Sequence, residues 1–254
     1  MPDPATGVTV VIPARFGSSR FPGKPLVSLC GRPMIQHVYE RARASVGVCR
    51  VIVATDDQRI ADVVTGFGGE VVVTTKLYRT GTDRVAGISR DLPGDVFVNL
   101  QGDEIPMHPN LLGDLITPFL DGTAPMGTLK RPLRDERDLR NPAVVKVVTG
   151  VDGQALYFSR APIPLVRDAA PGPGVADGLH YVHLGLYIYT RTALNRLAAF
   201  PTSPLEEAEK LEQLRALEHG LTIRVWETSY PSVRLDTPAD VGLVEAALQR
   251  PVPC

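Results

Sequence analysis

Residues 8–25 read VTVVIPARFGSSRFPGKP, and this stretch decides the expected fold. Its first part, Val8–Ile12, is a continuous apolar and β-branched run, which is typical of a buried strand. Pro13 is expected to end that strand, and a polar segment rich in Gly and Pro then extends to Pro25. The stretch therefore predicts a buried strand that leads directly into a long polar loop.

Downstream of this loop, strand-like and helix-like segments alternate. Core spacing of Met34, Ile35, Val38 and Ala42 predicts a helix over 33–44. Further strands are expected at 49–54, 71–73 and 95–100, and further helices at 58–67 and 83–90. Because alternating strands and helices are the signature of a parallel sheet, we expect an α/β fold with a Rossmann-like, mostly parallel sheet flanked by helices.

The pattern changes after residue 125. Successive strands are expected at 126–133, 143–148, 154–158 and 183–189, and Asp152-Gly153 predicts a hairpin turn within this series. The prediction is completed by a strand at 221–226 and by helices at 191–199, 206–218 and 238–248. Gly220 is expected to end the helix at 206–218. Since no long linker is evident, we expect one domain over 1–254 with an antiparallel insertion at about 126–190.

Composition excludes several classes of protein. The chain has 254 residues, of which 44% are hydrophobic, enough for a packed core. With 27 Lys and Arg against 28 Asp and Glu, it has no broad electrostatic attraction to nucleic acid or to an anionic membrane. The 3 cysteines lack a CxxC pair and no leader pattern is evident, so we expect a reduced, cytoplasmic protein. No apolar run approaches the roughly 20 residues that a membrane span needs.

The loop after the first strand carries the densest chemistry. Arg15, Arg20 and Lys24 lie among Gly and Ser residues, whose backbone N–H groups can bind the phosphates of a triphosphate together with the cations. The loop is not a P-loop, because Gly17 and Gly23 are separated by five residues and Pro25 replaces the magnesium-binding Ser or Thr. It also lacks GxGxxG. The alternative is a solvated basic loop, and for Arg20 a surface salt bridge.

Carboxylates at strand ends are the candidate metal ligands. Asp103 follows a predicted buried strand, and Asp236 lies between a predicted strand and a helix. Magnesium prefers such oxygens and bridges phosphates. The carboxyl ends of the strands in a parallel sheet share one edge, so the two aspartates can lie close together although they are far apart in the sequence. The alternative for Asp236 is a helix cap before Thr237-Pro238, and Glu104 is a weaker candidate ligand.

The motifs resemble those of one family, the CMP-Kdo synthetases, which are 3-deoxy-manno-octulosonate cytidylyltransferases. The resemblance begins with Arg15, Arg20 and PGKP at 22–25. The other matching blocks follow in order along nearly the whole chain: VIVATD at 51–56, TGTDR at 80–84, VNLQGDE at 98–104, NP at 141–142, VKV at 145–147, ALYFSR at 155–160, HLGLY at 183–187, SPLE at 203–206, LEQLR at 211–215 and DTP at 236–238.

This resemblance implies a fold and an activity. The fold would be of the nucleotide-diphospho-sugar transferase type. The enzyme would transfer CMP from CTP to the anomeric hydroxyl of 3-deoxy-D-manno-octulosonate (Kdo), giving CMP-Kdo and pyrophosphate for lipopolysaccharide-type glycans. Mg2+ held by Asp103 and Asp236 would be the cofactor, and the insertion would serve sugar binding and homodimer formation. No Ser-His or Cys-His constellation suggests a covalent intermediate, so we expect direct displacement.

The resemblance also implies individual site residues. Catalytic roles fall to Arg15, Lys24, Asp103 and Asp236. Positions expected to bind the nucleotide are Pro13, Ala14, Arg15, Arg20, Lys24, Thr82 and Arg84. Positions expected to bind the sugar acid are Gln101, Arg160, Arg167, His183, Tyr187, Glu212 and Gln213. Without the resemblance, His183 would be a satisfied core histidine and the last two would be exposed helix polarity.

The sequence departs from the family pattern at three places. Tyr78-Arg79-Thr80 stands where the family has a His-Gln/Lys-Ser type of run, Ile105-Pro106 follows Glu104 in place of Pro alone, and Arg234-Leu235 precedes Asp236 in place of Gly and an aliphatic residue. Rival functions are a cytidylyltransferase for 8-amino-Kdo or a sialic-type acid, a UTP- or GTP-dependent sugar-phosphate enzyme, and a silent nucleotide-binding homologue. Neither nucleic acid nor membrane is an expected partner.

Overall fold

The computed structural model describes residues 7–17, 21–167, 175 and 178–250. Two compact units are present: Met1–Thr117 with Tyr230–Cys254, and Pro118–Ser229. We call them the first and second unit and describe each by itself. Within the described residues, none of the helices has the length and apolar character needed to cross a bilayer.

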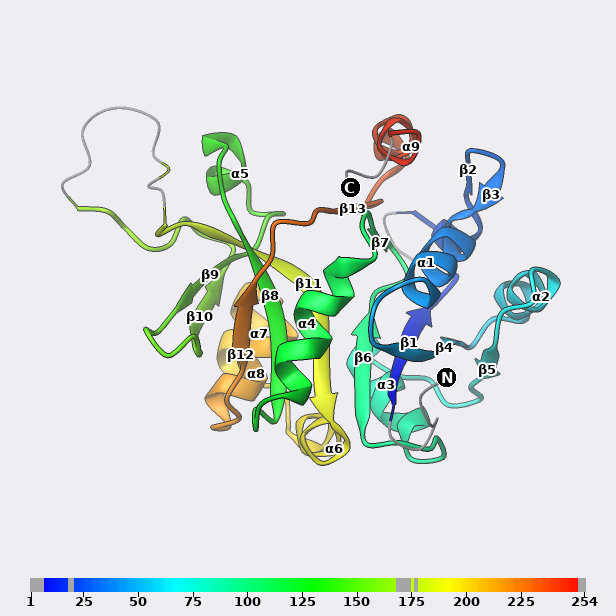
Figure 1. The fold of residues 1–254 in the computed structure, drawn as a ribbon, viewed down its shortest axis with the longest axis horizontal. Coiled ribbons are helices and arrows are strands. Elements are labelled where there is room, and N and C mark those ends of the chain that lie inside the picture. Colours follow the sequence, from blue (N-terminus) through cyan, green and yellow to red (C-terminus); the bar gives the residue numbers. More distant parts are fainter. Residues whose placement is uncertain (1–6, 18–20, 168–174, 176–177, 251–254) are drawn as a thin grey trace. The chain divides into compact units, whose positions relative to one another are not determined.

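A parallel sheet forms the centre of the first unit. Its strands are β1 (Val8–Ala14), β4 (Val48–Thr55), β5 (Val71–Val73) and β6 (Val96–Leu100), and they lie in the order β6-β1-β4-β5 (Figure 1). All pairs are parallel. Every residue of β1 is buried, which explains why the strand reads as a continuous apolar run. The predicted strands and the α/β fold class are confirmed.

Helices flank this sheet at the predicted places. They are α1 (Met34–Arg43), α2 (Gln58–Gly66) and α3 (Gly81–Ser89). The helix predicted near the C-terminus is α9 (Val241–Leu248). A further helix, α4 (Asn110–Leu120), spans the boundary between the units along the chain and was not predicted. The expected core positions of α1, Met34, Ile35, Val38 and Ala42, are all 0% exposed.

The prediction that Pro13 ends the first strand is wrong, because β1 continues to Ala14. Its pairs with β6 reach only as far as Val11, whereas its pairs with β4 continue through Pro13 and Ala14. Pro13 thus lies where β1 pairs with β4 on one side and has no pairing with β6 on the other. A missing N–H is tolerated in such a position.

Short elements complete the first unit. A hairpin joins β2 (Ser28–Leu29) to β3 (Arg32–Pro33), and two single-turn helices are η1 (Lys24–Leu26) and η2 (Pro238–Asp240). An antiparallel pair joins β7 (Glu104–Pro106) to β13 (Ser232–Arg234). This last pair was not predicted, and it connects two segments about 130 residues apart in the chain.

The second unit is mainly antiparallel. Its strands are β8 (Met126–Pro132), β9 (Lys146–Thr149), β10 (Ala155–Ser159), β11 (Tyr181–Thr190) and β12 (Arg224–Glu227). β10 pairs with β9, β9 with β11 and β11 with β8, all antiparallel, and β12 adds to β8 in parallel. Gly153, with φ 77°, makes the predicted hairpin turn between β9 and β10. Helices α5 (Glu136–Arg140) and α6 (Arg191–Ala199) also belong to this unit.

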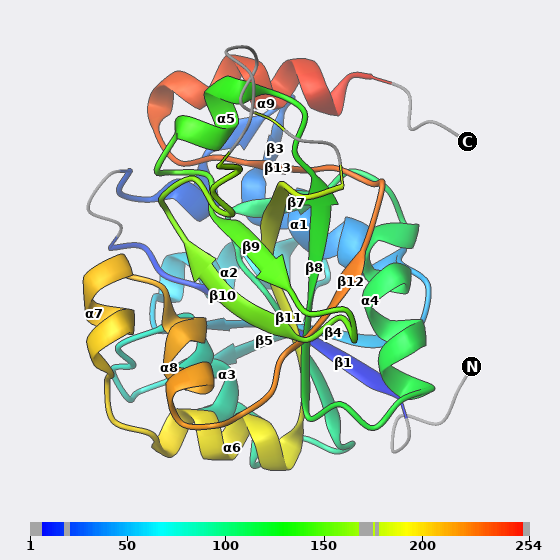
Figure 2. The ribbon, with the colours of Figure 1, turned by 90° about the vertical axis from the view of Figure 1, so that its left-hand side faces the viewer.

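The predicted helix over 206–218 is wrong, because two helices, α7 (Pro204–Glu209) and α8 (Glu212–Glu218), occupy this segment (Figure 2). Lys210 interrupts them in the left-handed conformation, with φ 53°. The Glu209 carboxylate accepts hydrogen bonds from Ser159 Oγ at 2.6 Å and Arg160 N at 2.9 Å. These contacts with β10 hold the end of α7 in place, and helical periodicity alone carries no sign of them.

Candidate active site

Lys24 is delivered to the site by the loop that follows β1. Gly23 adopts φ 72°, a left-handed conformation that favours glycine, and its N–H donates to Phe16 O at 2.9 Å. η1 begins at the next residue. Lys24 is only 6% exposed. Because a buried charge needs a partner, the ammonium of Lys24 is paired with a carboxylate.

Asp103 lies just beyond the carboxyl end of β6, as predicted. The chain reaches it through Gly102, where an added Cβ would lie 3.0 Å from Pro13 O at the end of β1. Leu235 N donates to Asp103 O at 3.1 Å, which fixes the backbone of this turn. The Asp103 side chain is 21% exposed, and its Oδ2 accepts a hydrogen bond from Lys24 Nζ at 2.7 Å.

Asp236, near the other end of the sequence, also lies close to the Lys24 ammonium. The β7–β13 pair places Arg234 opposite Glu104, so the residue two positions beyond Arg234 is brought beside Asp103. Asp236 Oδ1 lies 3.8 Å from Lys24 Nζ. The structure therefore brings together three of the four predicted catalytic residues, Lys24, Asp103 and Asp236.

The alternative interpretation of Asp236 as a helix cap is wrong. Thr237 is the N-cap residue of η2, and Asp240 completes a capping box with it. The Asp240 carboxylate accepts hydrogen bonds from Thr237 N at 2.7 Å and from Asp236 N at 3.0 Å. These bonds lower the pKa of Asp240. Asp240 thus holds the backbone of Asp236 and leaves its carboxylate to face the cations.

Glu104 has a structural setting. It is 5% exposed, and Ser232 Oγ donates to its Oε1 at 2.7 Å across the β7–β13 pair. Burial raises the pKa of the Glu104 carboxyl above its usual value, and the Asp103 and Asp236 carboxylates act in the same direction. The nearby Arg234 guanidinium opposes that rise. This bonding fits an acceptor that holds two strands together better than it fits a metal ligand.

The paired carboxylates fit a divalent cation. Asp103 and Asp236 already converge on one ammonium, which shows that their oxygens reach a common point. Mg2+ is commonly held by one or two carboxylates together with substrate phosphates and water. Among the residues that the structure describes, no cluster of three or more His, Cys, Asp or Glu side chains is suited to a metal. The pair thus suits a cation that arrives with a phosphorylated substrate.

The other predicted phosphate ligands lie on or after β1. Pro13 and Ala14 are buried at the end of this strand. The side chain of Arg15, the next residue, is exposed and has no ion pair with any carboxylate in the described part of the chain. Arg20 lies outside the described residues. Arg15 is therefore a cation available to a phosphorylated ligand.

A chain of polar side chains lies beside this loop. Gln101 Nε2 donates to Asn99 Oδ1 at 3.0 Å, and Asn99 Nδ2 lies 3.4 Å from Thr82 Oγ1. A Cβ added at Gly81, the first residue of α3, would lie 3.2 Å from the Gln101 amide and 3.1 Å from Pro13. Gln101 and Thr82, predicted for sugar and nucleotide respectively, thus share one network in the first unit. Sequence reasoning missed Asn99, although a polar residue at the end of the apolar run 96–98 was a usable signal.

Arg84, predicted to contact the nucleotide, has two protein partners. It is 4% exposed, and its guanidinium donates to Asp56 Oδ2 at 2.8 Å and to Thr74 Oγ1 at 2.9 Å. Asp56 follows β4 and Thr74 follows β5. Arg84 thereby ties the N-terminal part of α3 to the ends of two neighbouring strands.

We expect the Arg84→Met variant to lose about 2–3 kcal/mol of unfolding free energy, because it leaves Asp56 without its buried partner. Urea denaturation measures this loss. Adding Asp56→Asn should restore part of it, since the second change removes the abandoned charge. Unchanged unfolding free energy together with a raised KM for CTP would instead identify Arg84 as a nucleotide ligand.

The remaining predicted sugar residues lie in the second unit. Arg160 donates to three carbonyl oxygens, of Glu209 at 2.7 Å, Pro142 at 2.8 Å and Lys210 at 3.4 Å. These bonds occupy much of its guanidinium. Arg167 is exposed. The structure therefore gives Arg160 a role in holding the break between α7 and α8, whatever else it binds.

A cluster of aromatic and polar residues surrounds His183. Its Nε2 lies 3.0 Å from Thr128 Oγ1, and its ring contacts Phe158 edge-on with centroids 4.9 Å apart. The Tyr187 ring lies 5.3 Å from the His183 ring. The 8% exposure of His183 agrees with a satisfied core histidine. On α8, Gln213 is buried and Glu212 is half-buried.

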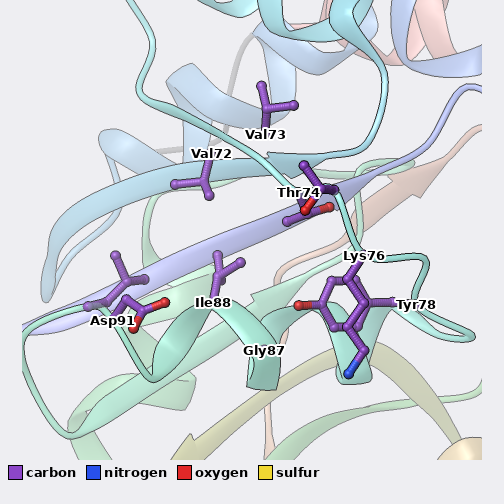
Figure 3. Close-up of a pocket in the computed structure, with 10 residues that line it drawn as sticks. Val72, Val73, Thr74, Lys76, Tyr78, Gly87, Ile88 and Asp91 are labelled. Atoms are coloured by element: carbon purple, nitrogen blue, oxygen red, sulfur yellow. The ribbon is translucent and has the colours of Figure 1, made fainter.

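A pocket of about 240 Å³ lies in the first unit (Figure 3). It is lined by Val72, Val73, Thr74, Thr75, Lys76, Tyr78, Gly87, Ile88, Asp91 and Leu92. Tyr78 lies beside Gly87 of α3, and Ile88 and Asp91 follow along the same segment (Figure 3). None of the predicted site residues lines this pocket, although Thr74 of its lining accepts a hydrogen bond from Arg84.

Known proteins similar to this chain include cytidylyltransferases that act on octulosonates. A family model described as cytidylyltransferase matches residues 9–223. The 3-deoxy-manno-octulosonate cytidylyltransferase of Syntrophotalea carbinolica is 52% identical over 248 residues, covering 95% of this chain and 98% of that protein. The 8-amino-3,8-dideoxy-manno-octulosonate cytidylyltransferase of Shewanella piezotolerans is 47% identical, covering 95% and 98%. A structure of CMP:2-keto-3-deoxy-manno-octonic acid synthetase complexed with CTP matches with TM-score 0.87 and 41% identity, covering 95% and 98%.

Proposed function

The chain belongs to the cytidylyltransferase family, and from this premise we propose that it transfers CMP from CTP to Kdo, giving CMP-Kdo and pyrophosphate. The family predicted from the motifs is confirmed, and the chain is a nucleotidyltransferase. Similarity at 52% identity to a protein named for this reaction supports Kdo as the acceptor. Lipopolysaccharide-type glycan synthesis is the process this product would supply.

The observation that carries the proposal is the convergence of Asp103, Asp236 and Lys24. It places two carboxylates and a buried ammonium at 2.7 and 3.8 Å, beside a loop that bears the exposed Arg15. Nucleotidyl transfer depends on neutralising the leaving pyrophosphate and aligning the attacking oxygen with the α-phosphorus. A mixed site of cations and metal-binding carboxylates meets both needs.

The reaction requires one displacement at phosphorus. The anomeric hydroxyl oxygen of the sugar bonds to the α-phosphorus, the bond from that phosphorus to the α,β-bridging oxygen breaks, and the hydroxyl proton is released. Lys24 and Arg15 bind phosphate oxygens and balance the charge that grows on the leaving group. Asp103 and Asp236 would hold Mg2+, which would lower the pKa of the acceptor hydroxyl and screen phosphate charge. Asp240 keeps Asp236 oriented through its backbone bonds.

The other parts of the proposal rest on the family resemblance. They are Arg20, Pro13, Ala14, Thr82 and Arg84 as nucleotide contacts, Gln101, Arg160, Arg167, His183, Tyr187, Glu212 and Gln213 as sugar contacts, a homodimer built through residues 126–190, and a cytoplasmic location. Of the nucleotide contacts, Arg84 receives the least support, since Asp56 and Thr74 already occupy its guanidinium.

A substrate panel tests the function. The enzyme is incubated with Mg2+, each of the four nucleoside triphosphates and Kdo, 8-amino-Kdo or a sialic-type acid, and pyrophosphate release and product mass are measured. We expect product only with CTP, and the highest kcat/KM with Kdo. A higher kcat/KM for the 8-amino acid would correct the acceptor, and nucleotide binding without any pyrophosphate would identify a silent homologue.

A further inference from the structure

Arg234 lies between the two carboxylates proposed to hold the metal. Its Nε is 3.4 Å from Asp236 Oδ1, and its Nη2 is 3.9 Å from Asp103 Oδ2. It is the last residue of β13, so its backbone is fixed by the pairing with Glu104 of β7. The guanidinium thus contacts both candidate metal ligands from a defined position.

Lys24 and Arg234 both offset the negative charge of this carboxylate pair. Among the described residues, the cationic side chains of Lys24 and Arg234 face the carboxylates of Asp103 and Asp236. A divalent cation that binds the same oxygens must therefore compete with charges already present. The cost of that competition depends on which cation can leave.

The two cations differ in how firmly they are held. The Lys24 side chain is 8% exposed and its ammonium lies 2.7 Å from Asp103. The Arg234 side chain is 47% exposed, and its contacts are longer, at 3.4 and 3.9 Å. Ion pairs with exposed partners contribute little stability, and a guanidinium at the end of a long side chain can turn into solvent. Arg234 is therefore the cation that can be displaced.

We propose that Arg234 is a displaceable counter-cation that competes with the divalent metal for Asp103 and Asp236, and so sets the metal concentration the enzyme requires. This inference rests on the metal assignment in the proposed function. Arg234 acts as a positioning residue: it holds the charge of the pair while no metal is bound and moves away when metal binds. Without it, the two carboxylates would attract the metal more strongly.

Metal binding to the nucleotide-free protein tests this directly. Mn2+ is titrated into the full chain, and free Mn2+ is followed by electron paramagnetic resonance. We expect Arg234→Gln to bind Mn2+ about three- to tenfold more tightly than the unaltered protein, a change in keeping with one partly exposed charge. Arg234→Lys keeps a cation and should stay within about twofold.

A matched control separates this local effect from net charge. Arg137, 91% exposed and paired with Asp135 in the second unit, is the control position. Arg137→Gln removes the same charge and should leave Mn2+ affinity unchanged. A second measurement is the melting temperature in EDTA, which should fall for Arg234→Gln and recover more on adding Mn2+ than that of the unaltered protein.

Three results would overturn the proposal. They are Mn2+ affinity of Arg234→Gln equal to or weaker than that of the unaltered protein, an equal gain in Arg137→Gln, and a raised KM for CTP without any change in Mn2+ binding. Asp103→Asn distinguishes failure at the level of the site. If that variant still binds Mn2+ normally, the metal assignment is wrong, whereas pyrophosphate release by the unaltered enzyme tests the reaction independently.

Discussion

Replacing Asp103 by Asn is expected to lower kcat for CTP-dependent pyrophosphate release by about 10²–10³-fold. The amide keeps the shape of the side chain but loses the charge that the proposed Mg2+ site and Lys24 both require. Steady-state kinetics at saturating CTP and Kdo, with Mg2+ varied, measure the effect. The Mg2+ concentration for half-maximal rate should rise as well, because one of the two proposed carboxylate ligands is gone.

A control for this variant must change a carboxylate of similar chemistry elsewhere in the first unit. Asp62, exposed on α2 and bonded by Gln58 Nε2 at 2.7 Å, is suitable, and Asp62→Asn should keep the normal rate. Circular dichroism checks that Asp103→Asn remains folded. A folded Asp103→Asn enzyme with unchanged kcat and unchanged Mg2+ dependence would contradict the assignment of this residue.

The residues that meet at the site could be named from the sequence, but the contact between them could not be derived from local patterns. Asp103 follows a strand whose apolar run is visible in the sequence, so its place at the sheet edge was predictable. Asp236 reaches it through the pairing of β7 and β13, each three residues long. Strands so short show no recognisable alternation of apolar and polar residues from which they could be predicted. Their pairing also depends on residues that are distant in the sequence.

Local signals failed where tertiary contacts decide the backbone. The segment 206–218 has the composition of one helix. Ser159 donates to the Glu209 carboxylate and Arg160 donates to the Glu209 carbonyl oxygen, and these bonds fix the break at Lys210. A proline normally ends a strand. Here β1 continues through Pro13, because β4 still pairs with it where β6 no longer does. In both places the deciding partner lies outside the window in which propensity operates.

Arg84 shows the same difficulty for function. Its place in the TGTDR block at 80–84 associates it with the nucleotide, whereas in the structure Asp56 and Thr74 bind its guanidinium. Asp56 belongs to another of the quoted blocks, so two motif residues bind each other. A motif marks positions that matter to a site, and only the geometry distinguishes those that touch the ligand from those that hold the site together.

Replacing Lys24 by Met is the second change expected to have a large effect. The side chain keeps its length and much of its volume, but the site loses the buried ammonium that lies 2.7 Å from Asp103 and 3.8 Å from Asp236. We expect kcat/KM for CTP to fall about 10²–10³-fold, because phosphate charge on the leaving group is no longer balanced. Steady-state kinetics measure this loss, and Lys76→Met, at an exposed lysine, is the control.

The Lys24→Met variant also separates a structural role from a catalytic one, because the two roles respond differently to metal. Without metal, the two carboxylates would lose the more deeply buried of the two cations that the described residues place beside them, and unfolding free energy should fall by about 1–3 kcal/mol in EDTA. Mg2+ supplies the missing positive charge and should restore stability, yet it cannot replace an ammonium that binds phosphate, so activity should stay low. Recovery of both stability and activity on adding Mg2+ would show that Lys24 serves only to balance the carboxylates, and its assignment as a phosphate ligand would be wrong.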